Sequence, residues 1–256
     1  METLKNMADR EKVKEASLGE KGNHYHKSQY ENPKRSTNAL CNFVSRILPL
    51  TDNPYNAIDV GCGGGANIYY LSKILSDTKW TGLDSSGKYF DLAKQYMPIY
   101  DQVTFVQGDF YELSEIFPNK SFDLAFSIQN LSWLPDYEDA MKEIMIATKK
   151  WIFVTSLFSD FNVDVFSDVI EYDDDWISTE GSPYNYNVYS YGKFKDFCLD
   201  CGAQELISED FIMDIDLPIP ENKQMGTYTL KDINEKRLQF SGPLYMPWKM
   251  IAIRME

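Results

Sequence analysis

A glycine-rich segment at residues 59–65 has the composition of a ligand-binding turn. It reads DVGCGGG, closes a short β-type run and precedes a helical pattern that begins near Asn67. Glycines let the backbone turn sharply and approach a ligand closely, and the start of a helix offers N–H groups to an anion. The carboxylate of Asp59 is suited to orienting backbone amides and a ligand ammonium group. Because residues 61–66 also fit the G-x-G-x-x-G/A pattern of dinucleotide-binding proteins, the glycines alone leave two classes of cofactor open.

Acidic residues also stand at the ends of the next two β-type runs. Asp84 ends the run that begins at Trp80, where a carboxylate can accept both hydroxyls of a ribose, as it does in dinucleotide enzymes too. Asp109 follows the third run in Gly108-Asp109-Phe110 and can accept a hydrogen bond from the amine of an adenine, with Phe110 packing on the base. Gly-Asp is also common turn chemistry, so a structural role for Asp109 stays open.

The fourth β-type run ends in polar and then aromatic residues. Residues 127–133 read SIQNLSW, which places Ser127, Gln129 and Trp133 at or just beyond its end. Ligands of open α/β sheets bind outside the carboxyl ends of the strands, so these side chains are candidates to line the same site. Trp133 is equally compatible with a core position.

Short β-type runs alternate with helix-period segments through the middle of the chain, which predicts a doubly wound parallel sheet. An amphipathic helix at 36–48 precedes the alternation as an N-terminal cap. The first five predicted strands are 57–60, 80–83, 103–107, 122–127 and 151–155. The helices between them are 68–75, 89–97, a short stretch near Leu113, and 137–148.

The C-terminal third predicts two more strands. A helix through 194–199 ends at Gly202, where a glycine can take the left-handed cap conformation. The runs 211–217 and 249–254 have no crossover helix between them, so we expect them to pair antiparallel as a hairpin. The predicted fold is therefore an α/β, Rossmann-like, doubly wound sheet of seven strands, parallel except for the final hairpin strand, with an N-terminal helical cap.

Taken in order, the motifs in residues 56–153 resemble those of the class I S-adenosylmethionine-dependent methyltransferases. The resemblance rests on residues 59–65, Asp84, 108–110 and 122–127, and it extends to the closing antiparallel hairpin. It implies S-adenosyl-L-methionine as cofactor and S-adenosyl-L-homocysteine as product.

The same resemblance assigns roles along the cofactor. It places Asp59 and Gly61 at the methionine moiety, Asp84 at the ribose, Asp109 at the adenine amine, and Ser127 and Gln129 on the sulfonium side. The neighbouring residues that complete the expected cofactor site are Cys62, Gly63, Ser85, Gly108 and Phe110.

The segment 24–37 is expected to form a further wall of the site. It looks like the cap that precedes the first strand in small-molecule members of the family, where a Tyr and an Arg can close over the methionine end. This likeness assigns Tyr30 and Arg35 to the cofactor. The alternative is a surface strap in which Ser36 or Thr37 caps the following helix.

The general base, if the acceptor needs one, is unknown. His24 and His26 are the two histidines of the chain, and a side-chain pKa of about 6.5 suits proton transfer. Solvated histidines on the strap are the alternative.

Two long connections leave the carboxyl ends of parallel strands, at 158–191 and 218–247, and we expect both to overhang the transferred methyl group. Connections of this length are often functional lids. Candidates to contact the acceptor are Trp133, Tyr184, Tyr186 and Arg237. The acidic run 173–175 is interpreted as a solvated face, and no metal is predicted.

The expected acceptor is a small polar molecule, with O-methylation favoured over N-methylation. Residues 28–37 and 237–248 are similar to methyltransferases of bacterial surface-glycan gene clusters, which implies a sugar or a sugar- or nucleotide-linked intermediate. Two rival functions use the same glycines: a nicotinamide-dependent oxidoreductase, and a cofactor-binding subunit without catalysis.

Composition limits the partners. The formal net charge of −14 argues against nucleic acid, and the apolar runs are far too short for a membrane span. The lack of a secretory h-region predicts a cytoplasmic protein with four reduced cysteines, acting as a monomer or homodimer. A single domain is expected, divided into a tail (1–22), the cap (23–50), the cofactor-binding core (55–157), a lid insertion (158–192) and a last helix, hairpin and second lid (193–256).

Overall fold

A mixed sheet forms the centre of the molecule. The structure, a computed structural model, describes residues 27–48, 54–179, 183–221 and 224–256. In these ranges the sheet runs in the order β3-β2-β1-β4-β5-β13-β9, and the short strand β8 pairs with β5 beside that path. The strands are β1 (Asn56–Val60), β2 (Lys79–Asp84), β3 (Val103–Gln107), β4 (Phe122–Ile128), β5 (Thr148–Ser159), β8 (Tyr189–Ser190), β9 (Glu205–Asp210) and β13 (Trp248–Arg254).

Strand β13 runs antiparallel to both of its neighbours, β5 and β9. The pairs β1–β2, β1–β4, β2–β3 and β4–β5 are parallel. The prediction of an α/β fold with a doubly wound sheet and one antiparallel strand is confirmed.

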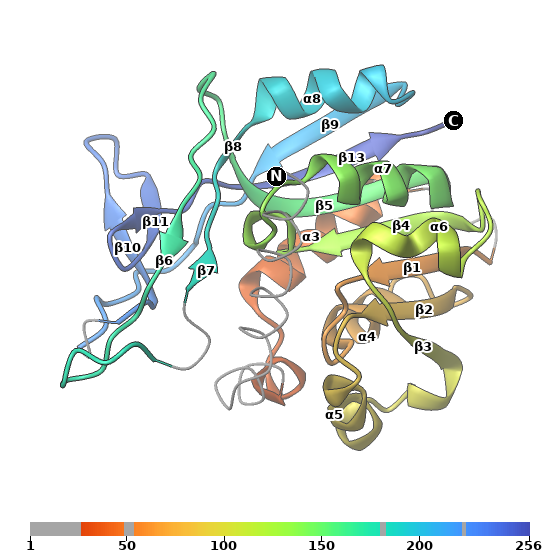
Figure 1. Cartoon of the computed structure of the whole chain (residues 1–256), viewed down its shortest axis with the longest axis horizontal. Helices are drawn as coiled ribbons and strands as arrows, with labels where there is room; N and C mark the ends of the chain where they lie inside the picture. Colours follow the sequence, from red (N-terminus) through yellow and green to blue (C-terminus); the bar gives the residue numbers. More distant parts are fainter. Residues whose placement is uncertain (1–26, 49–53, 180–182, 222–223) are drawn as a thin grey trace.

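Helices cover both faces of this sheet (Figure 1). One face packs against α3, α4 and α5, and the other packs against α6, α7 and α8. The helices are α3 (Arg35–Ile47), α4 (Ala66–Ser72), α5 (Lys88–Tyr96), α6 (Leu113–Ile116), α7 (Glu138–Ala147) and α8 (Tyr191–Asp200). Short 3-10 turns are η1 (Tyr100–Gln102), η2 (Phe110–Glu112) and η3 (Leu131–Trp133).

The central strands are apolar on both faces because helices cover both. In β1, Ile58 belongs to the core on the α7 side, whereas Ala57 belongs to the core on the α3 side. Across the neighbouring strands β4 and β5, the rings of Phe126 and Phe153 stack with centroids 5.2 Å apart. This burial on both faces explains why short apolar runs predicted these strands.

The predicted strand 211–217 is wrong. The strand that completes the sheet is β9, and the residues after it form an irregular segment. β9 pairs with β13 from Glu205 opposite Arg254 to Asp210 opposite Lys249, and both facing pairs are ion pairs, at 3.1 and 2.5 Å. The ends of β9 are acidic, which is not typical of a strand inside a sheet, and their charges are neutralised by cations of the partner strand β13. The sequence of β9 alone therefore does not predict a strand.

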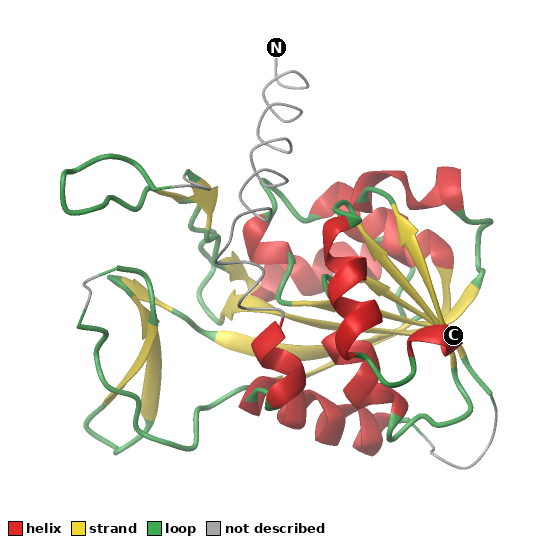
Figure 2. Cartoon of the chain, turned by 90° about the horizontal axis from the view of Figure 1, so that it is seen from below, coloured by secondary structure: helices red, strands yellow, loops and turns green. Residues whose placement is uncertain are grey.

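Two long loops extend beyond the core on the side to which β4 and β9 point (Figures 1 and 2). The first loop, residues 160–188, contains the antiparallel pair β6 (Asp168–Val169) and β7 (Tyr184–Asn185). The second loop, residues 211–247, contains an antiparallel sheet of β10 (Thr227–Lys231), β11 (Arg237–Ser241) and β12 (Leu244–Tyr245). The sequence indicates both loops as long connections but not the sheet inside the second.

Candidate functional site

The glycine turn after β1 is held against the end of β2. The N–H of Gly61 donates to the carbonyl oxygen of Leu83 at 2.8 Å, and the N–H of Gly63 donates to Oδ2 of Asp84 at 2.8 Å. The φ angles of Gly61, Gly63 and Gly65 are 76°, 52° and 79°, a region that favours glycine. The turn therefore requires glycine at these alternate positions.

Two side chains lie directly against the bare Cα of Gly61. A Cβ added there would stand 2.5 Å from Cζ of Phe110 and 2.6 Å from Nδ2 of Asn130. Nδ2 of Asn130 also donates to the carbonyl of Val60 at 2.8 Å. The structure thus brings the predicted Phe110 to the turn. Asn130 was missed as a site residue, although its position just beyond the fourth strand was the available signal.

Asp59 is buried beneath the turn, with no exposed surface. Neither carboxylate oxygen has a hydrogen-bond partner among the described residues. Burial raises the pKa of Asp59 well above its usual range, and the nearby Asp84 carboxylate raises it further. A buried carboxyl without a partner is costly to a fold, so its presence here points to a ligand that supplies one.

Asp84 closes β2 and organises two loops at once. Its Oδ2 accepts from Gly63, and its Oδ1 accepts from the N–H of Ser86 at 2.9 Å. Burial raises the pKa of Asp84, while these two amide hydrogen bonds oppose the rise. Ser85, between the two loops, is half-buried, and its carbonyl accepts from Nε2 of Gln107 at 3.1 Å.

Asp109 caps a short turn. Its Oδ1 accepts from the N–H of Tyr111 at 3.2 Å, at the start of η2. The structural role left open for Asp109 is therefore present. A Cβ at the preceding Gly108 would stand 2.4 Å from Cδ1 of Ile116, the end of a flexible side chain that would have to shift.

The end of β4 carries Ser127 and Gln129. Ser127 is fully buried, and its hydroxyl has no partner among the described residues. Gln129 has a φ of 62°, unusual for a residue with a side chain, and its N–H donates to both the carbonyl (2.8 Å) and Oγ1 (3.0 Å) of Thr155. Its Nε2 donates to Oγ of Ser36 at 3.3 Å. The predicted Gln129 thus links the cap helix to the sheet.

The N-terminal segment reaches the glycine turn through Tyr30. The Tyr30 hydroxyl donates to the carbonyl of Gly64, and its ring lies 6.1 Å from that of Tyr69 and 6.4 Å from that of Tyr96. Burial raises the pKa of Tyr30, with a further rise from Cys62. His24 and His26 lie outside the described residues.

The capping role considered for Ser36 or Thr37 is wrong. The N-cap of α3 is Lys34, without a side-chain cap bond, and Thr37 Oγ1 instead donates to Oδ1 of Asn67 at 3.3 Å. α3 therefore begins before both residues, which lie on its first turn, and their side chains contact Gln129 (Ser36) and Asn67 (Thr37) instead.

Two predicted arginines are engaged by aspartates of the second loop. Arg35 pairs with Asp214, and Arg237 on β11 pairs with Asp216 through Nε at 2.6 Å. The Arg237 guanidinium lowers the pKa of Asp216. Neither arginine contacts the glycine turn in this arrangement.

The three aromatic acceptor candidates come together. The ring of Trp133 stacks on Tyr184 with centroids 5.1 Å apart and an interplanar angle of 17°, and it lies 5.4 Å from Tyr186. Tyr184 and Tyr186 belong to the first loop, whereas Trp133 follows β4. This cluster, Trp133 with Tyr184 and Tyr186, fastens the first loop beside the end of β4.

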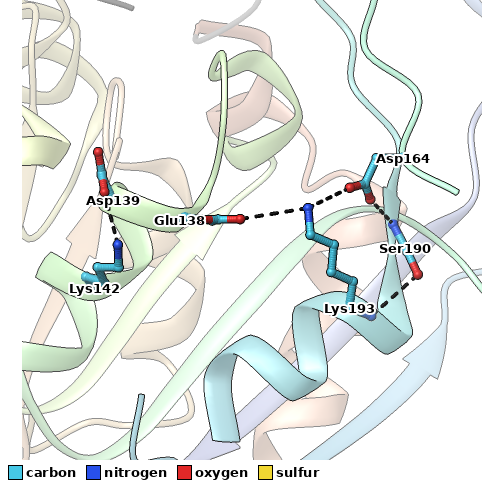
Figure 3. Close-up of polar contacts among 6 residues, drawn as sticks. All are labelled: Glu138, Asp139, Lys142, Asp164, Ser190 and Lys193. Carbon is cyan, nitrogen blue, oxygen red and sulfur yellow. Dashed lines mark hydrogen bonds and ion pairs between the residues drawn. The ribbon is translucent and has the colours of Figure 1, made fainter. Parts of the chain in front are cut away.

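Lys193 fixes the base of the first loop to the core (Figure 3). Its Nζ lies 2.9 Å from Oδ2 of Asp164 and 3.8 Å from Oε1 of Glu138 at the start of α7. Oδ1 of Asp164 accepts from the N–H of Ser190 at 2.8 Å, and Oγ of Ser190 accepts from the N–H of Lys193 at 3.4 Å. The hydrogen bond to Asp164 raises the pKa of Lys193.

Glu171 joins the two loops farther from the core. Its Oε1 accepts from the Tyr184 hydroxyl at 3.0 Å, and its Oε2 accepts from the N–H of Met225 in the second loop at 3.1 Å. Burial raises the pKa of Tyr184, and Glu171 raises it further.

Within the described ranges, no three His, Cys, Asp or Glu side chains gather closely enough to hold a metal ion. None of the helices in those ranges has the length and apolar character needed to cross a bilayer. The four cysteines are free thiols. Cys62, under the glycine turn, is buried, and burial raises its pKa well above the usual range, which makes it an unreactive thiol.

Residues 57–150 match the model of a protein family described as a methyltransferase domain. The matched range begins in β1 and ends in β5, so it contains the glycine turn, Asp84 and Asp109.

Relatives of known name match part of the chain. Trans-aconitate 2-methyltransferase of Deinococcus radiodurans is 34% identical over 110 residues, which are 43% of this chain and 39% of that protein. Sterol 24-C-methyltransferase of Aspergillus fumigatus is 32% identical over 95 residues, which are 36% of this chain and 24% of that protein. The chain thus spans at most about two fifths of the length of these two relatives.

Solved structures share the fold over most of the chain. A complex between the Haloferax volcanii Trm112 methyltransferase activator and a methyltransferase matches with a TM-score of 0.59 at 14% identity, over 90% of this chain and 92% of that one. The YcgJ protein of Bacillus subtilis matches with a TM-score of 0.53 at 14% identity, over 86% and 98%. The family match, the strand order and the glycine turn agree, and residues 57–150 therefore form a methyltransferase domain.

Proposed function

We propose that the protein is an S-adenosylmethionine-dependent methyltransferase that methylates a hydroxyl, or an amine, of a small polar acceptor, with a sugar or a sugar- or nucleotide-linked intermediate as the expected class. The observation that carries the proposal is the pair of carboxylates, Asp59 and Asp84, around a glycine turn that has a bare Cα at Gly61.

The donor and acceptor groups of this turn suit the cofactor. Asp59 lacks a partner, as expected of a carboxylate that faces a ligand cation. Each oxygen of Asp84 accepts one amide N–H and keeps a second acceptor position for a ribose hydroxyl. Phe110 lies against Gly61, where its ring can pack on an adenine. Gly63, Gly108, Asp109, Ser127 and Gln129 are proposed to complete the cofactor site.

When bound, S-adenosylmethionine supplies an electrophilic methyl group that passes to the acceptor by in-line displacement. The main task of the chain is then to hold the acceptor oxygen or nitrogen in line with that methyl group and to exclude water. We infer that the cap helix and both loops do this as walls of one enlarged domain, in a monomer or homodimer. The names of the relatives give chemically different acceptors, so the acceptor class rests on the residues of this chain.

The test is turnover of the purified protein with methyl-labelled S-adenosylmethionine and a panel of sugars, sugar nucleotides and amines. We expect labelled product and an equal amount of S-adenosylhomocysteine with a hydroxylated acceptor. Thermal stabilisation by NAD but not by S-adenosylhomocysteine would instead support the oxidoreductase. Binding of S-adenosylhomocysteine without turnover on any acceptor would support a non-catalytic subunit.

A further inference from the structure

We propose that Asn187 is a positioning residue that couples binding of the cofactor to docking of the first loop on the core. The coupling element is η3, the 3-10 turn that lies between the glycine turn and the first loop. The inference rests on the proposed methyltransferase function, because it concerns the proposed acceptor wall, the aromatic cluster of Trp133, Tyr184 and Tyr186. Through this coupling, a bound cofactor favours the complete wall.

On one side, η3 is joined to the glycine turn through Asn130. The side chain of Asn130 lies against Gly61, where an added Cβ would stand 2.6 Å from Nδ2, and the same Nδ2 donates to the carbonyl of Val60 at 2.8 Å. The carbonyl of Asn130 accepts the N–H of Trp133 at 2.8 Å, which closes η3. A ligand that binds on the glycine turn therefore restricts Asn130, and with it the start of η3.

On the other side, the first loop supplies hydrogen bonds to η3. The last carbonyl groups of a helical turn have no partner within the turn. Here the carbonyl of Ser132 accepts the N–H of Asn187 at 2.8 Å, and the carbonyl of Leu134 accepts Nδ2 of Asn187 at 2.8 Å. The Tyr189 hydroxyl, just after the loop, lies 3.2 Å from the carbonyl oxygens of both Leu131 and Leu134. Undocking the loop would remove these partners and loosen η3.

Asn187 is the residue in which these contacts meet. Its side chain is fully buried, and its carboxamide oxygen accepts the N–H of Ser167, in the other half of the first loop, at 3.0 Å. Its Nδ2 also donates to the Tyr189 hydroxyl at 3.2 Å. Because a buried carboxamide is costly unless it is hydrogen-bonded, Asn187 holds both halves of the loop and η3 in one arrangement.

The sheet anchors η3 separately from the loop. The hydroxyl oxygens of Ser132 and Ser156, a residue of β5, lie 2.5 Å apart, and Oγ of Ser132 accepts the N–H of Leu157 at 3.0 Å. These bonds do not involve the loop, so the loop can leave η3 while the sheet stays folded. Docked and undocked loop are thus two states of one folded core.

Coupling between two sites is reciprocal. If the cofactor favours the docked loop, the docked loop must favour the cofactor by the same factor. A substitution that loosens Asn187 should therefore weaken cofactor binding, although Asn187 acts on η3 rather than on the glycine turn itself. A residue with a purely structural role would change the melting temperature and leave this affinity unchanged.

Two measurements test the proposal, with S-adenosylhomocysteine as the probe. Calorimetric titration gives the affinity, and hydrogen exchange followed by mass spectrometry gives the protection of residues 184–190 with and without the probe. In the wild type we expect the probe to slow exchange in this peptide severalfold, because the N–H of Asn187 is bonded to η3. In Asn187→Ala we expect this slowing to be lost and the affinity to fall about fivefold or more, the lower end of typical couplings between sites.

Asn185→Ala is the matched control. The side-chain amide of Asn185 donates to the carbonyl of Ser167 at 3.1 Å and to Oδ1 of Asp168 at 3.4 Å, both in the first loop. This variant should keep the wild-type affinity and the slowing of exchange by the probe. Tyr189→Phe removes only a hydroxyl and serves as a milder variant should Asn187→Ala fail to fold. It should reduce both effects in the same direction.

Four outcomes contradict these expectations. Unchanged exchange of residues 184–190 when the wild type is saturated with S-adenosylhomocysteine would overturn the proposal. So would a lower melting temperature with wild-type affinity in Asn187→Ala or, if that variant does not fold, in Tyr189→Phe, and so would equal losses of affinity in Asn187→Ala and Asn185→Ala. Failure of the wild type to bind S-adenosylhomocysteine would instead overturn the proposed function, and this inference with it.

Discussion

Among the site residues, Asp59 is the carboxylate with the least usual surroundings. It is buried without a hydrogen-bond partner, and its pKa is raised first by burial and then by Asp84. Because the folded state holds its proton more tightly than the unfolded chain, Asp59 favours the ligand-free fold below a pH of about 4, the unfolded pKa. That contribution falls as the pH rises above the unfolded pKa and is lost as the pH passes the folded pKa, so the buried Asp59 makes the ligand-free protein less stable as the pH rises above about 4.

The substitution Asp59→Asn should therefore stabilise the ligand-free protein at pH 7. The gain is expected on the order of 1–3 kcal/mol, because the neutral amide removes the cost of burying an ionisable carboxyl, although it remains a buried polar group. The same change should weaken binding of S-adenosylhomocysteine, since the ligand's ammonium group would no longer have the Asp59 carboxylate as a partner. Chemical denaturation at several pH values and calorimetric titration measure the two effects.

A matched control is Asp77→Asn, on an exposed turn after α4. It should change neither the stability nor the affinity. Equal behaviour of the two variants would show that Asp59 is not a strained ligand carboxylate.

Gly61 provides a second prediction at this scale. Gly61→Ala would place a Cβ within 2.5 Å of Phe110 at a φ of 76°, so both the backbone and the packing oppose it. We expect at least about 1 kcal/mol of destabilisation from the backbone alone, together with a severe loss of cofactor affinity. Gly192→Ala, in α8 with no atom closer than 3.8 Å, should be neutral or slightly stabilising in thermal melts. Comparable melting temperatures for both variants would contradict the description of the turn.

Single residues were predictable where they end a predicted strand. Asp84 and Phe110 stand at the glycine turn as expected, because the carboxyl ends of parallel strands share one edge. The contacts of Thr155 and Ser36 with Gln129 were not predicted, because they depend on how α3 packs on the sheet. The partners of Arg35 and Arg237 are Asp214 and Asp216, in the segment 211–217, which the sequence predicts as a strand and the structure shows as irregular.

At the scale of elements, the helices and the first five strands followed from periodicity, since both faces of the sheet are covered. β9 escaped prediction because its ends are charged, whereas the alternating residues 211–217 resemble a strand but lack a partner. The sheet β10–β12 escaped because its residues are only partly buried and show no clear alternation.

Glu171 gives a prediction about the two loops. Because it accepts from both Tyr184 and Met225, Glu171→Ala should uncouple the loops. Loss of two hydrogen bonds of roughly 1 kcal/mol each should raise amide exchange severalfold or more near these two residues, with little change in the sheet. Hydrogen exchange followed by mass spectrometry measures the effect.

The exposed Asp174 of the same loop supplies the control, as Asp174→Ala. Its exchange should match that of the wild type. Unchanged protection around Tyr184 in Glu171→Ala, or equal protection loss in both variants, would mean that the loops are not joined through Glu171.

At the scale of the whole molecule, the segments outside the matched domain are arranged around one edge of the sheet. The matched methyltransferase domain ends in β5, and the cap helix before it and the two loops after it all meet near the carboxyl ends of the parallel strands. The net charge of −14 agrees with this arrangement, since aspartates of both loops neutralise the nearby cations. The resulting surroundings favour an uncharged acceptor.

The central claim is that the glycine turn and Asp84 bind S-adenosylmethionine. Calorimetric titration of S-adenosylhomocysteine into the wild type and into Asp84→Ala tests it, with circular dichroism to check that the variant is folded. We predict one site per chain in the wild type and at least tenfold weaker binding in the variant, because a charge-assisted hydrogen bond contributes about 1.5–3 kcal/mol. No binding to the wild type, or unchanged affinity in a folded Asp84→Ala variant, would contradict the claim.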